Sequence, residues 1–327
     1  MKAVWYDRTG PAREVFQYGD LPDPQPGRGQ VLIRVQASGV NPADTYLRGG
    51  ALAPMAYPRV IPNSDGAGVV AALGPGVEAH WLEQRIWFYN GQRNGRAFGS
   101  AAEFIALDVD LVRILPDLVS FAEGATLGIP CMTAHRAVFM NGPVQGQVVL
   151  VTGGAGAVGH YAVQLAKWAG ATVIATVSSP GKAKRARAGG ADHVVDYRTE
   201  DVARRVREIT GGQGAHHVVE VDLGGNLETA LKCVRQNGSV AYYATRGNQT
   251  PVFNVGAAMR LNLAITGVYL PVSPHAARRR AQDDITRWSG SGERILSVAA
   301  RFPLADCAAA HEAVEAGTKV GTVVVEP

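Results

Sequence analysis

The sequence predicts an α/β protein with a doubly wound parallel sheet and a second, β-rich domain. Three observations lead to this fold class. Residues 147–178 have the pattern of a strand, a glycine-rich turn, a helix and another strand. Helix-like and strand-like segments then alternate as far as residue 270. Before this region, the first 115 residues contain short strand-like runs separated by Gly and Pro.

The N-terminal region has turn-forming residues spaced between short strands, as in an antiparallel barrel. Its turn clusters, LPDPQPGRG (21–29) and LGPGVEAH (73–80), are rich in the residues that end strands. Many short strands of this kind are typical of a partly closed antiparallel barrel. The expected strands are residues 1–6, 31–37, 65–73, 84–89, 100–106 and 111–114. Helical segments at 122–127 and 133–141 lead into the glycine-rich unit.

The glycine-rich unit predicts a dinucleotide-binding turn. It starts with the apolar strand Val148–Val151, continues as a helix over 158–169, and ends with the strand Thr172–Val177. Its glycines have the spacing G-x-G-x-x-G, which lets the backbone approach a pyrophosphate at the N-terminus of the helix. The residues expected to contact the cofactor are Gly154, Gly156, Ala157, Val158 and Gly159.

The residues after the second strand indicate which dinucleotide binds. An NAD site usually carries Asp or Glu here, to accept a hydrogen bond from the ribose 2′-hydroxyl. This chain has Ser178, Ser179 and Lys182 instead, and contains no Asp or Glu from residue 124 to residue 191. Two hydroxyls and an ammonium suit a 2′-phosphate, so the sequence favours NADPH. A solvated basic helix is the alternative, and it applies to some of Lys184, Arg185 and Arg187.

The rest of the α/β region completes a six-stranded sheet. Helices are expected at 182–188, 202–210 and 227–231, and strands at 193–196, 217–221, 238–244 and 264–270. The tail has helical patterns at 274–287 and 305–315 and a last strand at 321–326. The expected domains are a catalytic domain over 1–120, a cofactor domain over 121–264, and a segment over 265–327 that returns to the catalytic domain.

Composition excludes several classes of protein. The chain has 327 residues, of which 46% are hydrophobic and 18% charged, as in a compact globular protein. The net charge of +4 is spread along the chain, which argues against a nucleic-acid surface. The three cysteines form no disulfide framework, so a reducing cytoplasm is expected. Neither a signal sequence nor an apolar run of membrane-spanning length is present.

Two N-terminal motifs, together with the glycine-rich unit, resemble a known family. They are SGVNPADTYLRGG (38–50) and YPRVIPNSDGAGVV (57–70). The chain resembles the zinc-independent, zeta-crystallin-like NADPH:quinone oxidoreductases of the medium-chain dehydrogenase/reductase superfamily. The resemblance extends through IPCMTAHRAV (129–138), DYRTED (196–201) and GTKVGTVVVEP (317–327). It implies a GroES-like β-barrel domain and a Rossmann domain, with the active-site cleft between them.

The resemblance also separates this chain from the zinc-containing alcohol dehydrogenases. Those relatives have Cys at the position of Asn41, and Gly-His-Glu where this chain has Asn63, Ser64 and Asp65. Zinc needs thiolate or imidazole ligands, which neither Asn41 nor Ser64 supplies. No metal is therefore expected, and the acceptor must already be electron-poor. Asp65 is expected to be a buried, hydrogen-bonded acid.

The resemblance implies that Asn41, Asp44 and Tyr46 line the cleft beside the nicotinamide. Asn41 offers a donor and an acceptor, Asp44 can orient a water or hydroxyl, and the Tyr46 phenol can donate to the acceptor oxygen. Each residue also has a structural interpretation. These are an Asn-Pro turn for Asn41, the N-cap of a helix over 44–49 for Asp44, and a packed aromatic for Tyr46.

The same resemblance implies further contacts with the cofactor. Thr133 matches a residue near the nicotinamide carboxamide, although a helix N-cap is its structural alternative. Tyr197 matches a residue at the 2′-phosphate and adenine. Residues at the ends of the later strands fall where the family backbone meets the nicotinamide half; they are Tyr243, Ala244, Arg246, Val268, Tyr269 and Leu270.

These expectations define a first hypothesis and its alternatives. The first is transfer of a hydride from NADPH to a quinone. The second is reduction of a C=C bond in an enal, enone or enoyl thioester by the same cofactor, because the motifs do not separate the two acceptors. The third is a nucleotide-binding structural or RNA-binding protein without turnover. The resemblance also implies a homodimer joined through the last Rossmann strand, within residues 264–270.

Overall fold

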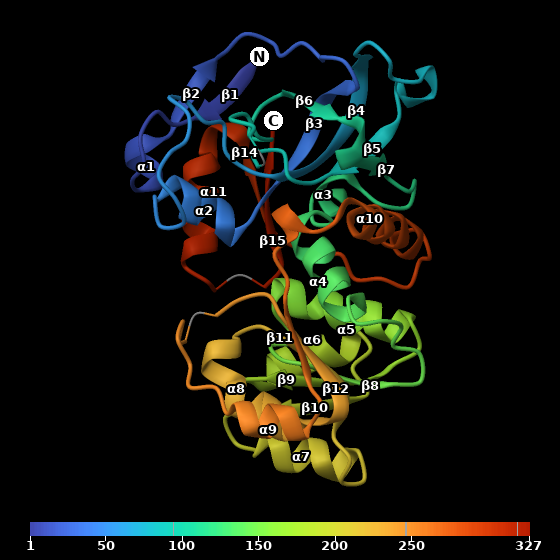
Figure 1. Cartoon of the computed structure of the whole chain (residues 1–327). Coiled ribbons are helices and arrows are strands. Elements are labelled where there is room, and N and C mark those ends of the chain that lie inside the picture. The colour runs from blue at the N-terminus through green and yellow to red at the C-terminus, as the bar shows by residue number, and fades with distance from the viewer. Residues whose placement is uncertain (94, 246, 319) are drawn as a thin grey trace. The chain divides into compact units, whose positions relative to one another are not determined.

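The computed structural model describes residues 1–93, 95–245, 247–318 and 320–327 (Figure 1). The chain divides into two compact units. The first unit comprises Met1–Pro130 and Arg278–Pro327, and the second comprises Cys131–Ala277. The sequence placed the corresponding boundaries after residues 120 and 264. Within the described ranges, no helix has the length and apolar character needed to cross a membrane.

The second unit is built on a six-stranded sheet with the order β10-β9-β8-β11-β12-β13, and every neighbouring pair is parallel. The expected doubly wound sheet is thus confirmed. Its strands are β8 Val148–Val151, β9 Thr172–Val177, β10 His193–Asp196, β11 Ala215–Glu220, β12 Val234–Tyr242 and β13 Ala264–Gly267. The order reverses between β8 and β11, and ligands of such sheets bind beyond the carboxyl ends of the strands at this point.

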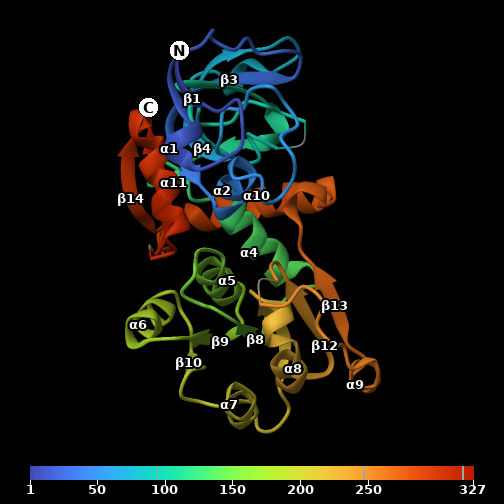
Figure 2. The same cartoon turned by 90° about the vertical axis from the view of Figure 1, so that its left-hand side faces the viewer.

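Helices cover both faces of this sheet. Figure 2 shows α5 (Ala157–Trp168) and α6 (Pro180–Ala188) on one face, and α7 (Val202–Ile209) and α8 (Leu223–Cys233) on the other. The unit also contains α9 (Val255–Arg260) and most of α4 (Ile129–Phe139). Helix α8 begins earlier than the sequence predicts, because Asp222 accepts a hydrogen bond from the Gly225 amide and caps it. The glycines of its first turn concealed this start.

The first unit contains a seven-stranded sheet with the path β14-β15-β3-β4-β5-β7, in which β6 also pairs with β3. All pairs except β14 with β15 are antiparallel. The strands are β3 Gln30–Val40, β4 Asp65–Leu73, β5 Arg85–Phe88, β6 Phe104–Asp108, β7 Val112–Ile114, β14 Val298–Pro303 and β15 Thr322–Glu326. A separate pair joins β1 (Lys2–Trp5) to β2 (Gln17–Asp20).

The C-terminal segment completes the first unit. Buried residues of β1, of β15 and of α11 (Cys307–Glu315) belong to one hydrophobic cluster, so the two ends of the chain share a core. The remaining helices are α1 Ala12–Val15, α2 Pro42–Arg48, α3 Phe121–Gly124 and α10 His275–Ser289. The sequence patterns predict none of α1, β2, α9 and β14, which are only four to six residues long.

Helix α2 starts before the position considered for it. The alternative in which Asp44 caps a helix over 44–49 is wrong, because the N-cap is Asn41 and Pro42 is the first helical residue. Proline is favoured at this position, since its φ suits the helix and its missing N–H is not needed. Asp44 therefore lies in the first turn, where its carboxylate accepts a hydrogen bond from the backbone N–H of Asn41 at 2.8 Å.

Candidate functional site

The glycine turn, residues 152–156, joins β8 to α5 and is shaped by close contacts. A Cβ on Gly154 would lie 2.7 Å from the Ala175 Cβ, and one on Gly159 would lie 2.2 Å from the Gly153 carbonyl oxygen. Glycine at these positions lets the turn lie against β9 and lets α5 start close to the turn. Gly153, which was not among the predicted residues, has a left-handed φ of 63°.

Two threonines tie the first half of this turn to neighbouring strands. The Gly153 amide donates to Thr176 Oγ1 at 3.1 Å, and the Gly154 amide donates to the Thr176 carbonyl at 3.0 Å. Thr152 Oγ1 accepts from the Val221 amide at 2.9 Å. No sequence pattern indicates these roles, because a threonine at a strand end fits the strand pattern whatever its side chain contacts.

The phosphate corner, consisting of Ser178, Ser179, Lys182 and Tyr197, lies where β9 and β10 end. Ser179 is the N-cap of α6. Lys182 Nζ donates to Ser178 Oγ at 2.9 Å, and the Tyr197 amide donates to the Val177 carbonyl at 3.1 Å. Lys182 and Tyr197 are exposed. Two hydroxyls, an ammonium and a helix N-terminus thus gather in one place, which is the chemistry of an anion site.

A cavity of about 640 Å³ lies at the same edge of the sheet, and this size is within the range of small-molecule sites. Glu220 lies at its base and is fully buried. Its Oε1 accepts from the Asp222 amide at 2.7 Å and from Asn226 Nδ2 at 2.8 Å. Burial raises the pKa of this carboxyl. Other lining residues include Thr152, Gly153, Thr176 and Tyr197, so the cavity adjoins the glycine turn and the phosphate corner.

The remaining predicted cofactor residues lie at several places in the second unit. Ala157 and Val158 form the first turn of α5. Tyr243 and Ala244 follow β12, and residues 268–270 follow β13. Val268 and Leu270 are buried, whereas Tyr269 is exposed. Thr133 lies within α4 rather than at its N-cap, and Arg246 lies outside the described residues.

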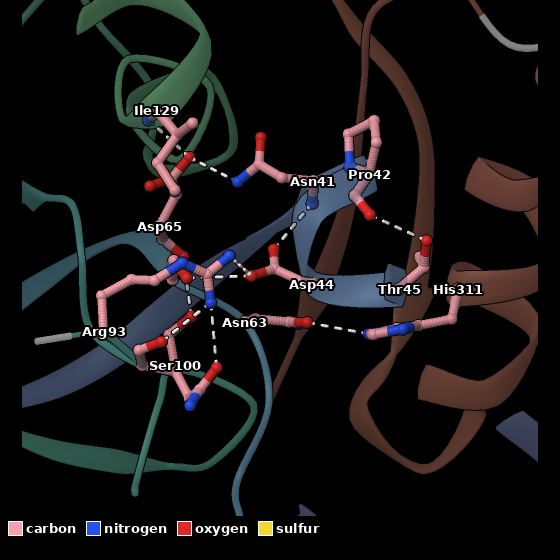
Figure 3. Close-up of polar contacts among 12 residues, drawn as sticks. Asn41, Pro42, Asp44, Thr45, Asn63, Asp65, Arg93, Ser100, Ile129 and His311 are labelled. Atoms are coloured by element: carbon pink, nitrogen blue, oxygen red, sulfur yellow. Dashed lines mark hydrogen bonds and ion pairs between the residues drawn. The ribbon is translucent and has the colours of Figure 1, made fainter. Parts of the chain in front are cut away.

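A buried polar network in the first unit contains Asn41 and Asp44 (Figure 3). Asn41 Nδ2 donates to Asp65 Oδ2 at 2.7 Å, and the same oxygen accepts from the Ile129 amide at 2.7 Å. Asp65 is fully buried, and burial raises its pKa well above the usual value, although the Asn41 hydrogen bond opposes this shift. Asp65 is thus the buried, hydrogen-bonded acid that was expected, and it orients the side-chain amide of Asn41.

Asp44 is held by three donors. Its Oδ2 accepts a hydrogen bond from the backbone N–H of Asn41. Its Oδ1 accepts from Ser64 Oγ at 2.9 Å and from Arg93 Nη2 at 3.0 Å. Asp44 is almost fully buried, so the Arg93 guanidinium compensates a charge removed from water. No sequence pattern indicates Arg93, which follows β5 and lies far from Asp44 in the chain. Tyr46 lies one turn along α2 and is half-buried.

A second chain of buried hydrogen bonds supports this network. Asn63 Oδ1 pairs with His311 Nε2 at 2.8 Å, and Asn63 Nδ2 donates to Ser38 Oγ at 2.9 Å. Ser38 and Ser100 share a hydrogen bond of 2.8 Å. Burial, assisted by the charge of Arg48, lowers the pKa of His311 to about 3, so its ring is neutral. The C-terminal helix α11 thus helps to place the Asn63–Asp65 segment.

Comparison with protein families and relatives places these features in context. A family model described as zinc-binding dehydrogenase matches residues 157–283, and one described as alcohol dehydrogenase GroES-like domain matches residues 27–117. Among the residues that the structure describes, no group of three or more His, Cys, Asp or Glu side chains is arranged to hold a metal ion.

Individual relatives match the whole chain. A quinone oxidoreductase of Pseudomonas aeruginosa is 31% identical, and the match covers 96% of each protein. A 2-haloacrylate reductase of a Burkholderia species is 33% identical over 100% of this chain and 99% of its own length. The structure of a mycobacterial protein in complex with NADPH is 31% identical, with a TM-score of 0.85 over the full length of both chains.

Proposed function

The chain belongs to the quinone oxidoreductase family of the medium-chain dehydrogenase/reductase superfamily, and from this premise we propose that it reduces quinones with NADPH without a metal. As a member of this family it is an oxidoreductase. The observation that carries the choice of cofactor is the phosphate corner, in which Lys182 and Ser178 meet at the N-terminus of α6. Bound NADPH supplies a hydride from C4 of its nicotinamide ring.

The second unit fits the phosphates of this cofactor. A side chain at Gly154 or Gly159 would fill space that the glycine turn itself occupies, so the backbone can lie close to an anion at the start of α5. Ser178, Ser179 and Lys182 would hold the 2′-phosphate, and no acid occupies the position that would accept from a 2′-hydroxyl. The mycobacterial relative solved with NADPH supports the same cofactor.

The first unit supplies the groups proposed to act on the acceptor. Tyr46 would donate a hydrogen bond to the acceptor oxygen as negative charge develops on it. Asp65 holds the side-chain amide of Asn41 and Asp44 holds its backbone N–H, so the side chain is oriented before a ligand binds. Asp44 uses both of its oxygens within the protein, and we assign it the role of positioning Asn41. A proton from solvent completes the hydroquinone.

The proposed independence of a metal is supported by the chemistry of the same positions. Asn41 and Ser64 stand where the zinc-containing relatives carry Cys and His, and neither side chain is a usual zinc ligand. Asn41 Nδ2 and Ser64 Oγ instead donate hydrogen bonds to Asp65 and Asp44. An electron-poor quinone needs no Lewis acid to accept a hydride, so a hydrogen bond from the Tyr46 phenol is sufficient.

A second candidate function is reduction of an activated C=C bond. It is favoured by the 2-haloacrylate reductase, which matches the whole chain at an identity similar to that of the quinone oxidoreductases. A panel of acceptors tests both functions. NADPH oxidation by the purified protein should be fastest with benzoquinones or naphthoquinones. Faster turnover of 2-alkenals, 2-haloacrylate or crotonyl thioesters would favour the second function.

We further propose a cytoplasmic homodimer paired through the edge strand β13, which joins only β12 among the described strands. Three free cysteines are consistent with a reducing compartment. Val255, Met259 and Val272 are 66%, 73% and 75% exposed near this edge in sequence, as expected of a surface that a second copy covers.

Light scattering tests the dimer. It should give a mass near twice 34.5 kDa. Ala264→Lys should give a monomer, because Ala264 is exposed on β13 and a lysine there opposes pairing of edge strands. A monomeric wild-type protein at micromolar concentration would remove this proposal.

A further inference from the structure

Arg185 is hydrogen-bonded to the glycine turn, although the sequence pattern places it among the basic residues of a solvated helix. Its Nε donates to the Ala155 carbonyl oxygen at 3.1 Å. The side chain is half-buried, whereas Lys184 and Arg187 on the same helix are exposed. Among these three basic residues, Arg185 therefore differs in both burial and contact.

The other anchors of the glycine turn come from the sheet. Thr176 of β9 and Val219 of β11 hold the backbone of residues 152–154. The second half of the turn has a different anchor, because the Ala155 carbonyl is held by a side chain of α6. Glycine on both sides of Ala155 leaves the backbone little intrinsic preference. A fixed carbonyl thus limits the conformations of this half of the turn.

The hydrogen bond from Arg185 fixes the orientation of the peptide group between Ala155 and Gly156. The Ala155 carbonyl and the Gly156 N–H belong to the same planar group, so they rotate together. Arg185 holds the carbonyl, and the Gly153 carbonyl accepts from the Gly156 N–H at 2.9 Å. This plane lies directly before the first turn of α5, whose free N–H groups form the anion site of the fold.

Helix α6 carries both Arg185 and part of the phosphate corner. Lys182 and Arg185 are three residues apart and so lie on neighbouring positions of one helix face. Lys182 contacts Ser178, while Arg185 contacts the glycine turn. The helix is packed closely on α5, since a Cβ on Gly189 would lie 2.8 Å from His160 Cε1. Helix α6 therefore connects the two phosphate-binding elements.

We propose that Arg185 is a positioning residue that holds the glycine turn in the shape that receives the cofactor pyrophosphate. The inference rests on the proposed binding of NADPH. Because both NADPH and NADH carry the pyrophosphate, Arg185 acts on the affinity for both. Lys182 acts on the 2′-phosphate and hence on NADPH alone. Arg185 thus affects the affinity for both cofactors, and Lys182 affects the preference for NADPH over NADH.

The test compares two substitutions that differ in one hydrogen bond. Arg185→Gln keeps an N–H donor at the position of Nε, without the charge, and Arg185→Met keeps the length of the side chain without a donor. Dissociation constants for NADPH and NADH should rise by the same factor, about tenfold, in Arg185→Met. They should stay within about twofold of wild type in Arg185→Gln. Lys184→Met is the matched control and should leave both constants unchanged.

Each other outcome has a defined meaning. Unchanged constants in Arg185→Met would overturn the proposal. A loss confined to NADPH would also overturn it, because Arg185 would then bind the 2′-phosphate itself. An equal loss in Arg185→Gln would overturn the proposal, because the charge of Arg185, rather than its hydrogen bond to Ala155, would then determine the affinity. A lower unfolding temperature with unchanged constants would assign Arg185 a purely structural role and contradict the proposal.

A measurement without cofactor separates this inference from the proposed function. Amide hydrogen exchange at residues 153–158 should be faster in Arg185→Met than in wild type, and close to wild type in Arg185→Gln. If the wild-type protein binds neither NADPH nor NADH, the proposed function fails, whatever Arg185 does. If it binds them and the turn exchanges equally in all variants, the positioning role fails alone.

Discussion

The polar network of the first unit is closed, whereas the phosphate corner of the second unit is open. Asp44 and Asp65 are buried, and donors from four separate segments of the chain hold them. At the phosphate corner, Lys182 and Tyr197 are exposed, and the hydroxyl of Ser178 accepts from Lys182. At the first site the donors are already bonded within the protein, although Asp65 Oδ1 is buried without a partner in the described part of the chain. The second site offers donors that an anionic ligand can use.

This difference predicts different consequences of substitution. A closed network determines the orientation of its members before a ligand binds, so a change there affects folding or the rate of reaction. An open corner gains its charge partner from the ligand, so a change there affects affinity and leaves the fold intact. Four substitutions or treatments can break or sharpen this contrast.

Tyr46→Phe should have the largest effect, on the turnover number. Tyr46 lies on α2, the helix whose N-cap is Asn41. Loss of a hydrogen bond to developing charge costs about 10²-fold or more in turnover. The dissociation constant for NADPH should meanwhile stay within about twofold of wild type, because no phosphate contact changes. Single-turnover kinetics and a separate binding titration measure the two quantities.

The control for this prediction is a phenol of the second unit. Tyr197→Phe keeps the ring near the phosphate corner and should leave the turnover number unchanged. An unchanged rate in Tyr46→Phe would remove Tyr46 from the mechanism. A parallel loss of NADPH affinity would show that the two sites are not separable in this way.

Lys182→Ala should have the next largest effect, on affinity for NADPH. One charge-assisted contact with a phosphate is worth about 10- to 150-fold in affinity. The Michaelis constant for NADPH should therefore rise by about that factor, while that for NADH changes little. Lys184→Ala, on the same exposed helix, is the control and should change neither constant. Equal losses for both cofactors would contradict the assignment of Lys182 to the 2′-phosphate.

Much of the second unit could be predicted because its signals are local. Gly154, Gly156 and Gly159 lie in one short segment that extends into the first turn of α5. The strands before and after this strand–helix–strand unit have the predicted bounds Val148–Val151 and Thr172–Val177. Ser178, Ser179 and Lys182 are close in sequence, and their approach follows from one strand end and one helix start. Here local sequence and tertiary structure agree.

The network of the first unit could be predicted only in part, since its partners come from distant segments. Asn41 and Asp65 lie in recognisable motifs, but nothing local indicates that their side chains meet. Arg93 and His311 belong to segments with no motif. Arg93 follows β5, which pairs with β4, and His311 lies on α11, which shares a hydrophobic cluster with β15. The same reason explains Arg185, whose partner Ala155 lies in another element.

Asp65→Asn should have a smaller effect, on the free energy of unfolding. Asp65 Oδ2 accepts two hydrogen bonds that an amide oxygen can also accept, while Oδ1 is buried without a partner in the described part of the chain. Burial raises the pKa of this carboxyl in the folded protein. Above the pKa of the unfolded chain the folded state holds its proton more tightly, so stability falls as pH rises through this window.

The uncharged variant should escape this loss. At pH 8 Asp65→Asn should be more stable than wild type, and the difference should become smaller near pH 4, where the Asp65 carboxyl is protonated in the folded protein. Urea unfolding at the two pH values measures it. Asp65→Leu is the control, because it removes the acceptor for Asn41 and Ile129 and should destabilise the protein at both. An Asp65→Asn protein less stable than wild type at pH 8 would show that the charge itself supports the network.

Removal of metal should have the smallest effect, which is none. We expect no coordination site at Asn41 and Ser64, because both side chains donate hydrogen bonds to buried carboxyl groups. A zinc ion there would have to displace these hydrogen bonds and bind an amide and a hydroxyl, which are poor zinc ligands. Elemental analysis of the purified enzyme should therefore find much less than one zinc per chain, and a chelator should leave quinone reduction unchanged. Stoichiometric zinc whose removal abolishes activity would show that the first unit is open to a ligand after all, and the contrast with the phosphate corner would then fail.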